Sequence, residues 1–103
     1  MFRVLRAAQG DVRAITAWYQ KQRDGLQLEF LDDFEQALES VESDPSRLAA
    51  EESNPTPSDV RYKSLRRFPY RILVEVDGAD AAVIAVIHHH RRPGFWSGRA
   101  GRM

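Results

Sequence analysis

Three adjacent histidines, His88, His89 and His90, are the first side chains in the sequence that could do chemistry. Neighbouring side chains on a strand point to opposite faces, so only His88 and His90 could share a side. Two histidines without a third ligand nearby make a poor metal site, and the chain has no Cys to complete one. We therefore expect the histidine run to bind no metal.

Catalytic nucleophiles and phosphate-binding loops are missing from the sequence. It contains no Gly-x-Ser-x-Gly motif, which would present an activated serine on a tight turn. It contains no glycine-rich loop of the kind that holds the phosphates of a nucleotide. No cofactor is expected, and these patterns assign no catalytic residue.

A second set of candidate side chains is basic and lies in the C-terminal half. Arginine interleaved with aromatic residues, as around Phe95 and Trp96, suits contact with phosphates or bases. It suits an acidic peptide equally well, because the guanidinium group binds carboxylates in the same forked geometry. The cations could also protect a solvated sheet edge. The set comprises Arg61, Lys63, Arg66, Arg67, Arg71, Arg91, Arg92 and Arg99.

The charge of the chain is divided between its halves, although the net charge is zero. Residues 1–58 hold 6 basic and 11 acidic side chains, and residues 59–103 hold 9 basic and 4 acidic ones. Such a division predicts a basic surface that meets a polyanion or an acidic partner. The alternative is that the two halves neutralise each other within one fold.

The length and composition indicate one cytoplasmic domain. A chain of 103 residues has the size of a single domain, which we assign to residues 1–103. The first residues lack the long apolar stretch of a signal peptide. The longest apolar run, residues 81–87, is far shorter than the about 20 residues that span a bilayer. No contact with a membrane is expected, and the absence of Cys fits a reducing compartment.

The N-terminal half predicts one strand and two helices. Residues 2–6 alternate apolar and charged side chains, as in a half-buried strand. Asp11 is a plausible N-cap for a helix over residues 11–23. A second helix over residues 27–43 completes an antiparallel hairpin. Its buried stripe comprises Leu31, Phe34, Leu38 and Val41. Its acidic face, expected to be solvated, comprises Glu29, Asp32, Asp33, Glu35, Glu39 and Glu42.

The C-terminal half predicts three strands, at residues 60–67, 70–76 and 82–88. A loop over residues 44–58, with room for one helical turn, precedes them, and Asp77-Gly78 marks a hairpin turn. The last strand is apolar on both faces, which predicts a central strand covered on both sides. The order is β-α-α-β-β-β, an α+β fold with a mainly antiparallel sheet. The predicted core comprises Val12, Ile15, Tyr19, Leu31, Phe34, Leu38, Ile72, Val74, Ile84 and Val86.

One face of this sheet is left without cover by the predicted elements. The helical hairpin covers the other face only, and residues 89–103 look irregular. A partner peptide, bound as a helix or as an added strand, is expected to supply the cover.

With these motifs in order, the chain resembles the RelE/ParE toxin superfamily, and its ParE branch more closely. The resemblance covers nearly the whole chain. Three segments carry it: Asp11-Val12-x-x-Ile15-x-x-Trp18-Tyr19, continuing to Phe30 and Leu31; Val60-Arg61 with Phe68-Pro69-Tyr70-Arg71-Ile72; and a strand that ends in His88-x-x-Arg91-x-Pro93-x-x-Trp96, followed by Arg99.

The resemblance implies a toxin of a type II toxin–antitoxin pair, bound and inhibited by its cognate antitoxin. ParE-like members poison DNA gyrase, whereas RelE-like members cut messenger RNA on the ribosome with basic residues and often a C-terminal Tyr. The chain has Trp96 near the place of such a Tyr, and an indole cannot transfer a proton as a phenol can. Gyrase is therefore the favoured target. A third alternative is a module that binds its antitoxin and harms nothing.

The two activities would use different residues. Binding of gyrase is expected to concentrate on Arg91, Arg92, Trp96 and Arg99, since Trp and Arg are the commonest interface hot spots. The ribonuclease alternative would place Arg61, Lys63 and Arg91 around the scissile phosphate. Trp96 could instead pack the C-terminal tail onto the sheet.

Overall fold

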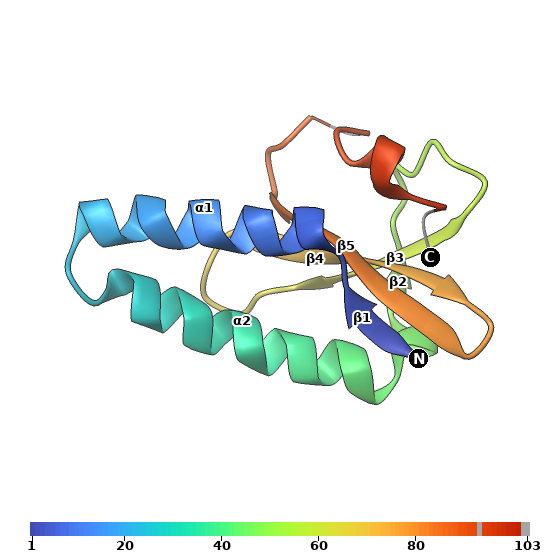
Figure 1. The fold of residues 1–103 in the computed structure, drawn as a ribbon, viewed down its shortest axis with the longest axis horizontal. Helices are drawn as coiled ribbons and strands as arrows, with labels where there is room; N and C mark the ends of the chain where they lie inside the picture. Colours follow the sequence, from blue (N-terminus) through green and yellow to red (C-terminus); the bar gives the residue numbers. More distant parts are fainter. Residues whose placement is uncertain (93, 102–103) are drawn as a thin grey trace.

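Two helices and a five-stranded sheet make up the part of the chain that the computed structural model describes, residues 1–92 and 94–101 (Figure 1). The elements are, in chain order, β1 (Phe2–Val4), α1 (Arg6–Gln22), α2 (Leu26–Ser43), the 3-10 turn η1 (Pro45–Arg47), β2 (Ala49–Ala50), β3 (Asp59–Ser64), β4 (Tyr70–Asp77), β5 (Asp80–His88) and the 3-10 turn η2 (Ser97–Arg99). Among the described residues, no helix is long and apolar enough to cross a membrane.

The sheet has the strand order β1-β5-β4-β3-β2. The pairs from β5 to β2 are antiparallel, and β1 joins the sheet beside β5 as its one parallel pair among the described residues. The predicted α+β class and the inner position of the last strand are confirmed, because β5 lies between β1 and β4. The short strand β2 was not expected within the loop over residues 44–58.

The first helix starts at Arg6, so the prediction that Asp11 caps it was wrong. Leu5 occupies the N-cap position without a side-chain hydrogen bond, and Gln9-Gly10 continues the helix. Gly10 costs about 1 kcal/mol relative to Ala within a helix, and α1 nevertheless continues through it from Ala7 and Ala8, which are the best helix formers. Asp11 consequently lies inside α1, where its carboxylate is available to other parts of the chain. The second helix begins within one residue of the predicted start.

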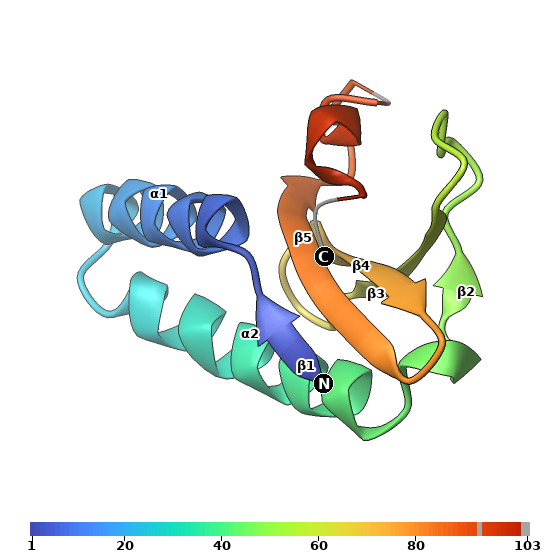
Figure 2. The same ribbon diagram turned by 45° about the vertical axis from the view of Figure 1, so that its right-hand side comes forward.

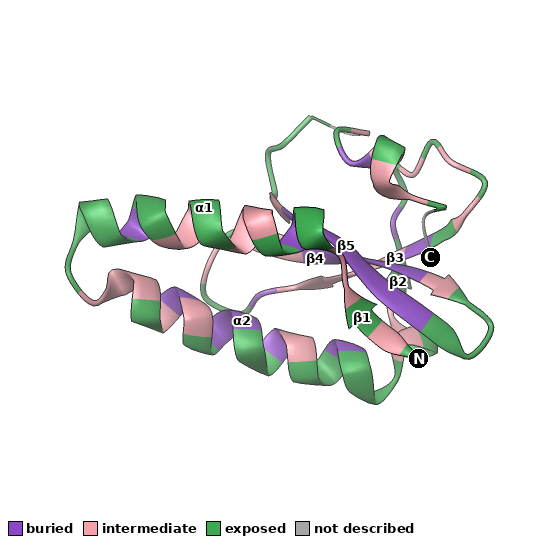
Figure 3. Ribbon diagram, viewed as in Figure 1, coloured by how far each residue is buried: buried purple, intermediate pink, exposed green. Residues whose placement is uncertain are grey.

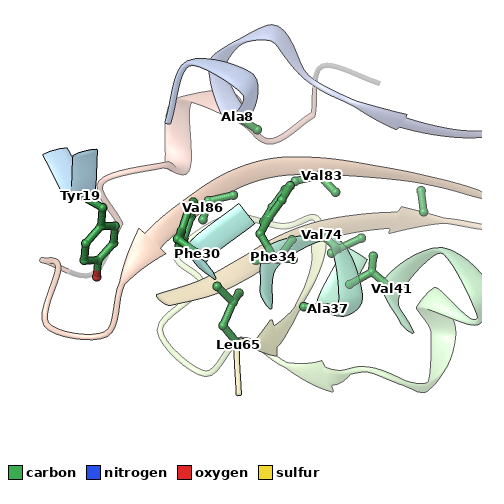
Figure 4. Close-up of a cluster of buried hydrophobic side chains, with 12 residues drawn as sticks. Ala8, Tyr19, Phe30, Phe34, Ala37, Val41, Leu65, Val74, Val83 and Val86 are labelled. Atoms are coloured by element: carbon green, nitrogen blue, oxygen red, sulfur yellow. The ribbon is translucent and has the colours of Figure 1, made fainter. Parts of the chain in front are cut away.

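The hairpin face of the sheet carries the larger core (Figure 4). The ring centres of Tyr19 and Phe68 are 5.0 Å apart and those of Phe30 and Tyr70 are 5.7 Å apart, and both pairs are arranged edge to face. Such pairs contribute roughly 0.5–1.5 kcal/mol beyond the burial of their area. The buried stripe of α2 is shifted by one position from the prediction, since Phe30 and Ala37 replace Leu31 and Leu38, which are half-buried. The buried residues of this core are Ala8, Tyr19, Phe30, Phe34, Ala37, Val41, Leu65, Ile72, Val74, Ala81, Val83 and Val86.

Asp33 departs from the solvated acidic face that was predicted for α2, because it is buried. Its carboxylate accepts hydrogen bonds from the backbone N–H groups of Arg66, Arg67 and Phe68, at 3.2, 2.9 and 3.0 Å. A buried backbone N–H without a partner costs free energy, so one carboxylate here satisfies three such groups. This turn around Asp33 ends β3 at Ser64, three residues before the predicted end.

A β-bulge in β5 reverses the alternation of its side chains. Leu73 pairs with Ala85 and Val74 pairs with Val83, which leaves Ile84 without an opposite residue on β4. An extra residue in one strand turns the following side chains to the other face. Ile84 therefore packs on the face away from the helices, and its predicted place in the hairpin core with Val86 was wrong.

The face away from the helices is covered by the chain's own C-terminal segment, residues 94–101 (Figure 2). Trp96 is the centre of this second core and is 0% exposed. Figure 3 shows one short buried stretch in this segment, among intermediate and exposed ones, above the buried length of β5. The expectation that a partner must supply cover for this face is corrected. The core comprises Val60, Leu73, Ala82, Ile84, Ala85 and Trp96, with Leu5, Tyr62, Ile87 and Ala100 half-buried around it.

Candidate functional site

The chain leaves the sheet at the end of β5 and presents a basic and aromatic surface there. Arg91 N–H donates to the carbonyl of His88 at 2.9 Å, which turns the chain immediately after the strand. The Arg91 guanidinium then lies 3.9 Å from the centre of the Phe95 ring. Phe95 is 41% exposed, and both Arg91 and Arg92 are exposed. We call Arg91, Arg92 and Phe95 the tail surface.

A cavity of about 310 Å³ separates the tail surface from α1. Arg91, Phe95 and His88 supply its cationic and aromatic rim, and Ala14 and Ile15 of α1 supply an apolar wall. Concave sites with an apolar wall and few polar groups receive anchoring side chains from partners. The arrangement suits an apolar side chain accompanied by a carboxylate or phosphate that Arg91 can reach.

Arg99 and Asp11 form a bidentate ion pair beneath the tail surface. The guanidinium contacts the carboxylate at 2.7 and 3.2 Å. Arg99 also donates to the carbonyl of Ile84 at 3.1 Å, and Val86 N–H donates to Asp11 at 3.0 Å. The side chains are 23% and 16% exposed. Arg99 is thus occupied by contacts within the chain, whereas Arg91 and Arg92 are exposed.

Trp96, the other predicted contact residue, is completely buried. Its indole packs against Leu73, Ile84 and Ala85 of the sheet. The alternative prediction, that Trp96 packs the C-terminal tail onto the sheet, agrees with this position. Sequence patterns cannot show this, because Trp is frequent both at interfaces and in cores.

The three residues of the ribonuclease alternative do not converge. Arg61 and Lys63 lie on β3, two strands away from β5, and neighbouring strands are about 4.8 Å apart. Arg61 binds Asp59 through its Nε and Nη2 atoms, at 3.0–3.3 Å, and also donates to the carbonyl of Ser46. This ion pair raises the pKa of Arg61 above its ordinary value. Arg91 lies beyond the far end of β5, so no single phosphate would contact all three.

The histidines follow β5 in a tight turn. His90 N–H donates to Nδ1 of His88 at 3.1 Å, and the two rings are 5.4 Å apart. Burial and the charge of Arg71 lower the pKa of His89, which favours its neutral form. Within the described ranges, no group of three or more His, Asp or Glu side chains is arranged to hold a metal ion. That the run binds no metal stays a prediction.

A second buried ion pair joins Glu51 to Arg71, and sequence reasoning did not identify it. The two groups are 2.8 Å apart, and the Arg71 guanidinium lies 4.3 Å from the centre of the Tyr62 ring. Burial opposes ionisation of Glu51, but hydrogen bonds from Ser53 and Arg71 outweigh it and lower the pKa. No spacing signal could have paired Glu51 with Arg71, because Glu51 lies in a loop. The pair fixes that loop to β4.

Comparison with known proteins gives a match to a family model and a match to a solved structure. A family model described as the ParE toxin of type II toxin–antitoxin systems, parDE, matches residues 2–93. Among solved structures, the chain is similar to one described as the chromosomal ParDE TA system from P. aeruginosa. The TM-score is 0.71 and the identity is 19%, over 84% of this chain and 92% of that one. At this identity the likeness shows the fold alone. No curated protein matches.

Proposed function

The chain belongs to the family of ParE toxins of type II toxin–antitoxin systems, and we propose that it inhibits DNA gyrase by binding it with the tail surface. The proposal places this action in the cytoplasm and assigns no chemistry to the toxin. A cognate antitoxin neutralises it by binding.

The exposure of Arg91, Arg92 and Phe95 beside a cavity is the observation that supports the proposal most. Arg91 follows the end of β5 by three residues, and the hydrogen bond from its N–H to the carbonyl of His88 ties its backbone to that strand. A rigid element that presents Arg and an aromatic ring is typical of interface hot spots. Of the contact residues expected from the sequence, Arg91 and Arg92 remain available to a target, while Trp96 and Arg99 support the segment from within.

The separation of Arg61 and Lys63 from Arg91 argues against ribonuclease chemistry. A ribonuclease needs a base and an acid within hydrogen-bond reach of the scissile phosphate. Arg61 is paired with Asp59, and a guanidinium group cannot serve as a base. Tyr62 packs under Arg71, where its ring supports an ion pair. The exposed cations therefore favour binding over cutting.

Neutralisation by an antitoxin rests on the family and not on an uncovered sheet face. The C-terminal segment covers the face for which a partner was expected. Large exposed apolar side chains remain elsewhere on the described surface, among them Trp18 and Leu28 on the helical hairpin. Apolar groups in this position fit an amphipathic partner segment.

Two reactions in vitro, run side by side, test the proposal. Purified toxin is added to gyrase with plasmid DNA, and separately to a translation reaction with ribosomes and labelled message. The proposal predicts that supercoiling is inhibited or that cleaved DNA accumulates, with the message left intact. Cleavage of ribosome-bound message that Lys63→Ala abolishes would overturn it in favour of the ribonuclease. Antitoxin binding without either effect would identify the inactive module.

A further inference from the structure

The edge of β5 that faces α1 loses its neighbouring strand halfway along. β1 ends at Val4, which pairs with Val83. The last backbone–backbone hydrogen bond from this part of the chain runs from Leu5 N–H to the carbonyl of Val83, at 2.9 Å. Beyond that point, no strand among the described residues lies beside this edge of β5. Backbone groups left there without partners would cost free energy.

Asp11 and Arg99 take the place of the missing strand. The Asp11 carboxylate accepts Val86 N–H, and the Arg99 guanidinium donates to the carbonyl of Ile84. One of these backbone groups belongs to Ile84, the bulged residue, and the other lies two residues after it, and Asp11 and Arg99 bind each other as well. One ion pair thus joins α1 to β5 and to the C-terminal segment, which both lie far from α1 in the sequence. We call this pair the clasp.

The clasp continues directly into the tail surface. The Arg99 guanidinium lies 5.2 Å from the centre of the Phe95 ring, which also carries Arg91 at 3.9 Å. Trp96, next to Phe95, packs into the sheet, and Arg99 N–H donates to the carbonyl of Trp96 at 2.9 Å. The orientation of Phe95 therefore depends on Arg99, and that of Arg91 depends on Phe95.

We propose that Asp11 and Arg99 are positioning residues for target binding: the clasp holds the C-terminal segment on β5 and keeps Phe95 and Arg91 in the geometry that the target recognises. This inference rests on the proposed function. The physical reason is preorganisation, because a segment that is ordered before binding does not have to be ordered at the expense of affinity. Neither residue has to touch the target.

The test uses the fluorescence of Trp96 together with the affinity for gyrase. The chain has two tryptophans, so a Trp18→Phe background makes buried Trp96 the only one. In that background, Asp11→Asn keeps an acceptor for Val86 N–H but removes the ion pair with Arg99. We expect Trp96 emission to shift to longer wavelength and the affinity for gyrase to fall by about tenfold. Arg99→Lys keeps the charge without the fork and should lie between wild type and Asp11→Asn.

Glu51→Gln is the matched control. It removes a carboxylate from an ion pair of similar length and exposure, 2.8 Å against 2.7 Å, that fixes a loop and not the C-terminal segment. A purely structural role for the clasp predicts that both variants lower the melting temperature and leave the affinity of the folded protein unchanged. A positioning role predicts that Asp11→Asn alone changes the affinity and the Trp96 emission.

The outcomes separate this inference from the proposed function. If neither the wild type nor the Trp18→Phe protein binds gyrase, the proposed function is wrong. If the Trp18→Phe protein binds gyrase, the Asp11→Asn variant in that background is compared with it. A shifted Trp96 emission with an unchanged affinity for gyrase would mean that release of the segment does not affect binding, and the inference is overturned. Unchanged emission in Asp11→Asn would show that the clasp does not hold the segment, which also overturns it.

Discussion

The two faces of the sheet are covered by different means. On the hairpin face, two helices contribute a continuous set of apolar side chains, with Tyr19 and Phe30 packed edge to face against Phe68 and Tyr70. On the opposite face, a short segment is attached mainly by Trp96, by the Arg99–Asp11 ion pair and by the Gly101 N–H, which donates to the buried Glu75 carboxylate. Burial on the hairpin face is therefore distributed over many residues, whereas attachment of the C-terminal segment depends on few.

This difference separates stability from recognition. Burial of apolar area is the main source of folding free energy, so the hairpin face should determine whether the domain folds. The segment on the other face is short, and it carries Phe95, which contacts the exposed Arg91 at the surface. Regions with few buried contacts open at a lower free energy than the global core. Substitutions on the two faces should therefore affect different measurements.

The largest effect is expected for Phe30→Ala on the hairpin face. Phe30 is 0% exposed and contacts four aromatic rings, those of Tyr19, Phe34, Phe68 and Tyr70. Truncation of a buried Phe costs about 3–5 kcal/mol, a large part of the stability of a small domain. Chemical denaturation followed by circular dichroism should show this loss, together with loss of antitoxin binding. A change under about 1 kcal/mol would remove Phe30 from the centre of the core.

Trp96→Ala tests the face of the sheet away from the helices. The indole is completely buried. We expect the segment that carries it to detach without unfolding the helices, because the helices pack on the other face of the sheet. We expect a loss of about 1–3 kcal/mol, smaller than for Phe30→Ala, because the loss cannot exceed the free energy of docking the segment. Growth inhibition should disappear while the helical signal in circular dichroism is retained. Full toxicity would contradict a role for the docked segment.

A smaller effect concerns pH and the Glu51–Arg71 pair. The folded state lowers the pKa of Glu51 from 4.5, where burial opposes ionisation and the hydrogen bonds from Ser53 and Arg71 outweigh it. A group with a depressed pKa stabilises the fold above its ordinary pKa and loses that contribution as pH falls through the folded value. Wild type should therefore lose more stability than Glu51→Gln as the pH falls below the ordinary pKa of 4.5 and through the lowered pKa of the folded state. Parallel curves of melting temperature against pH would contradict this.

Sequence periodicity predicted the elements but not the polar contacts between them. The apolar residues 82–87 identified a central strand, and the spacing of Phe34 and Val41 identified α2. Asp33 was assigned to the solvated face because its partners lie 33–35 residues away, at Arg66 to Phe68. Strand alternation misplaced Ile84 because it assumes that no residue is inserted.

The candidate site was predictable only where it follows from local patterns in the sequence. Arg91 and Arg92 follow a strand that the sequence identified, so their exposed position could be expected. The burial of Trp96 and the pairing of Arg99 with Asp11 depend on contacts over up to 88 residues, which no local pattern encodes. Asp11 was taken for a helix cap because its neighbours Gln9 and Gly10 resemble a break.

The most direct measurement is the affinity for gyrase of two variants that lose the same charge. Arg91→Ala removes the guanidinium that stacks on Phe95, whereas Arg66→Ala removes an exposed one beside α2. Truncation of an interface hot spot typically costs about 2 kcal/mol, or roughly thirtyfold in affinity. We predict that Arg91→Ala weakens binding about thirtyfold and that Arg66→Ala changes it less than about threefold. Equal losses in the two variants, or none in Arg91→Ala, would contradict recognition through the tail surface.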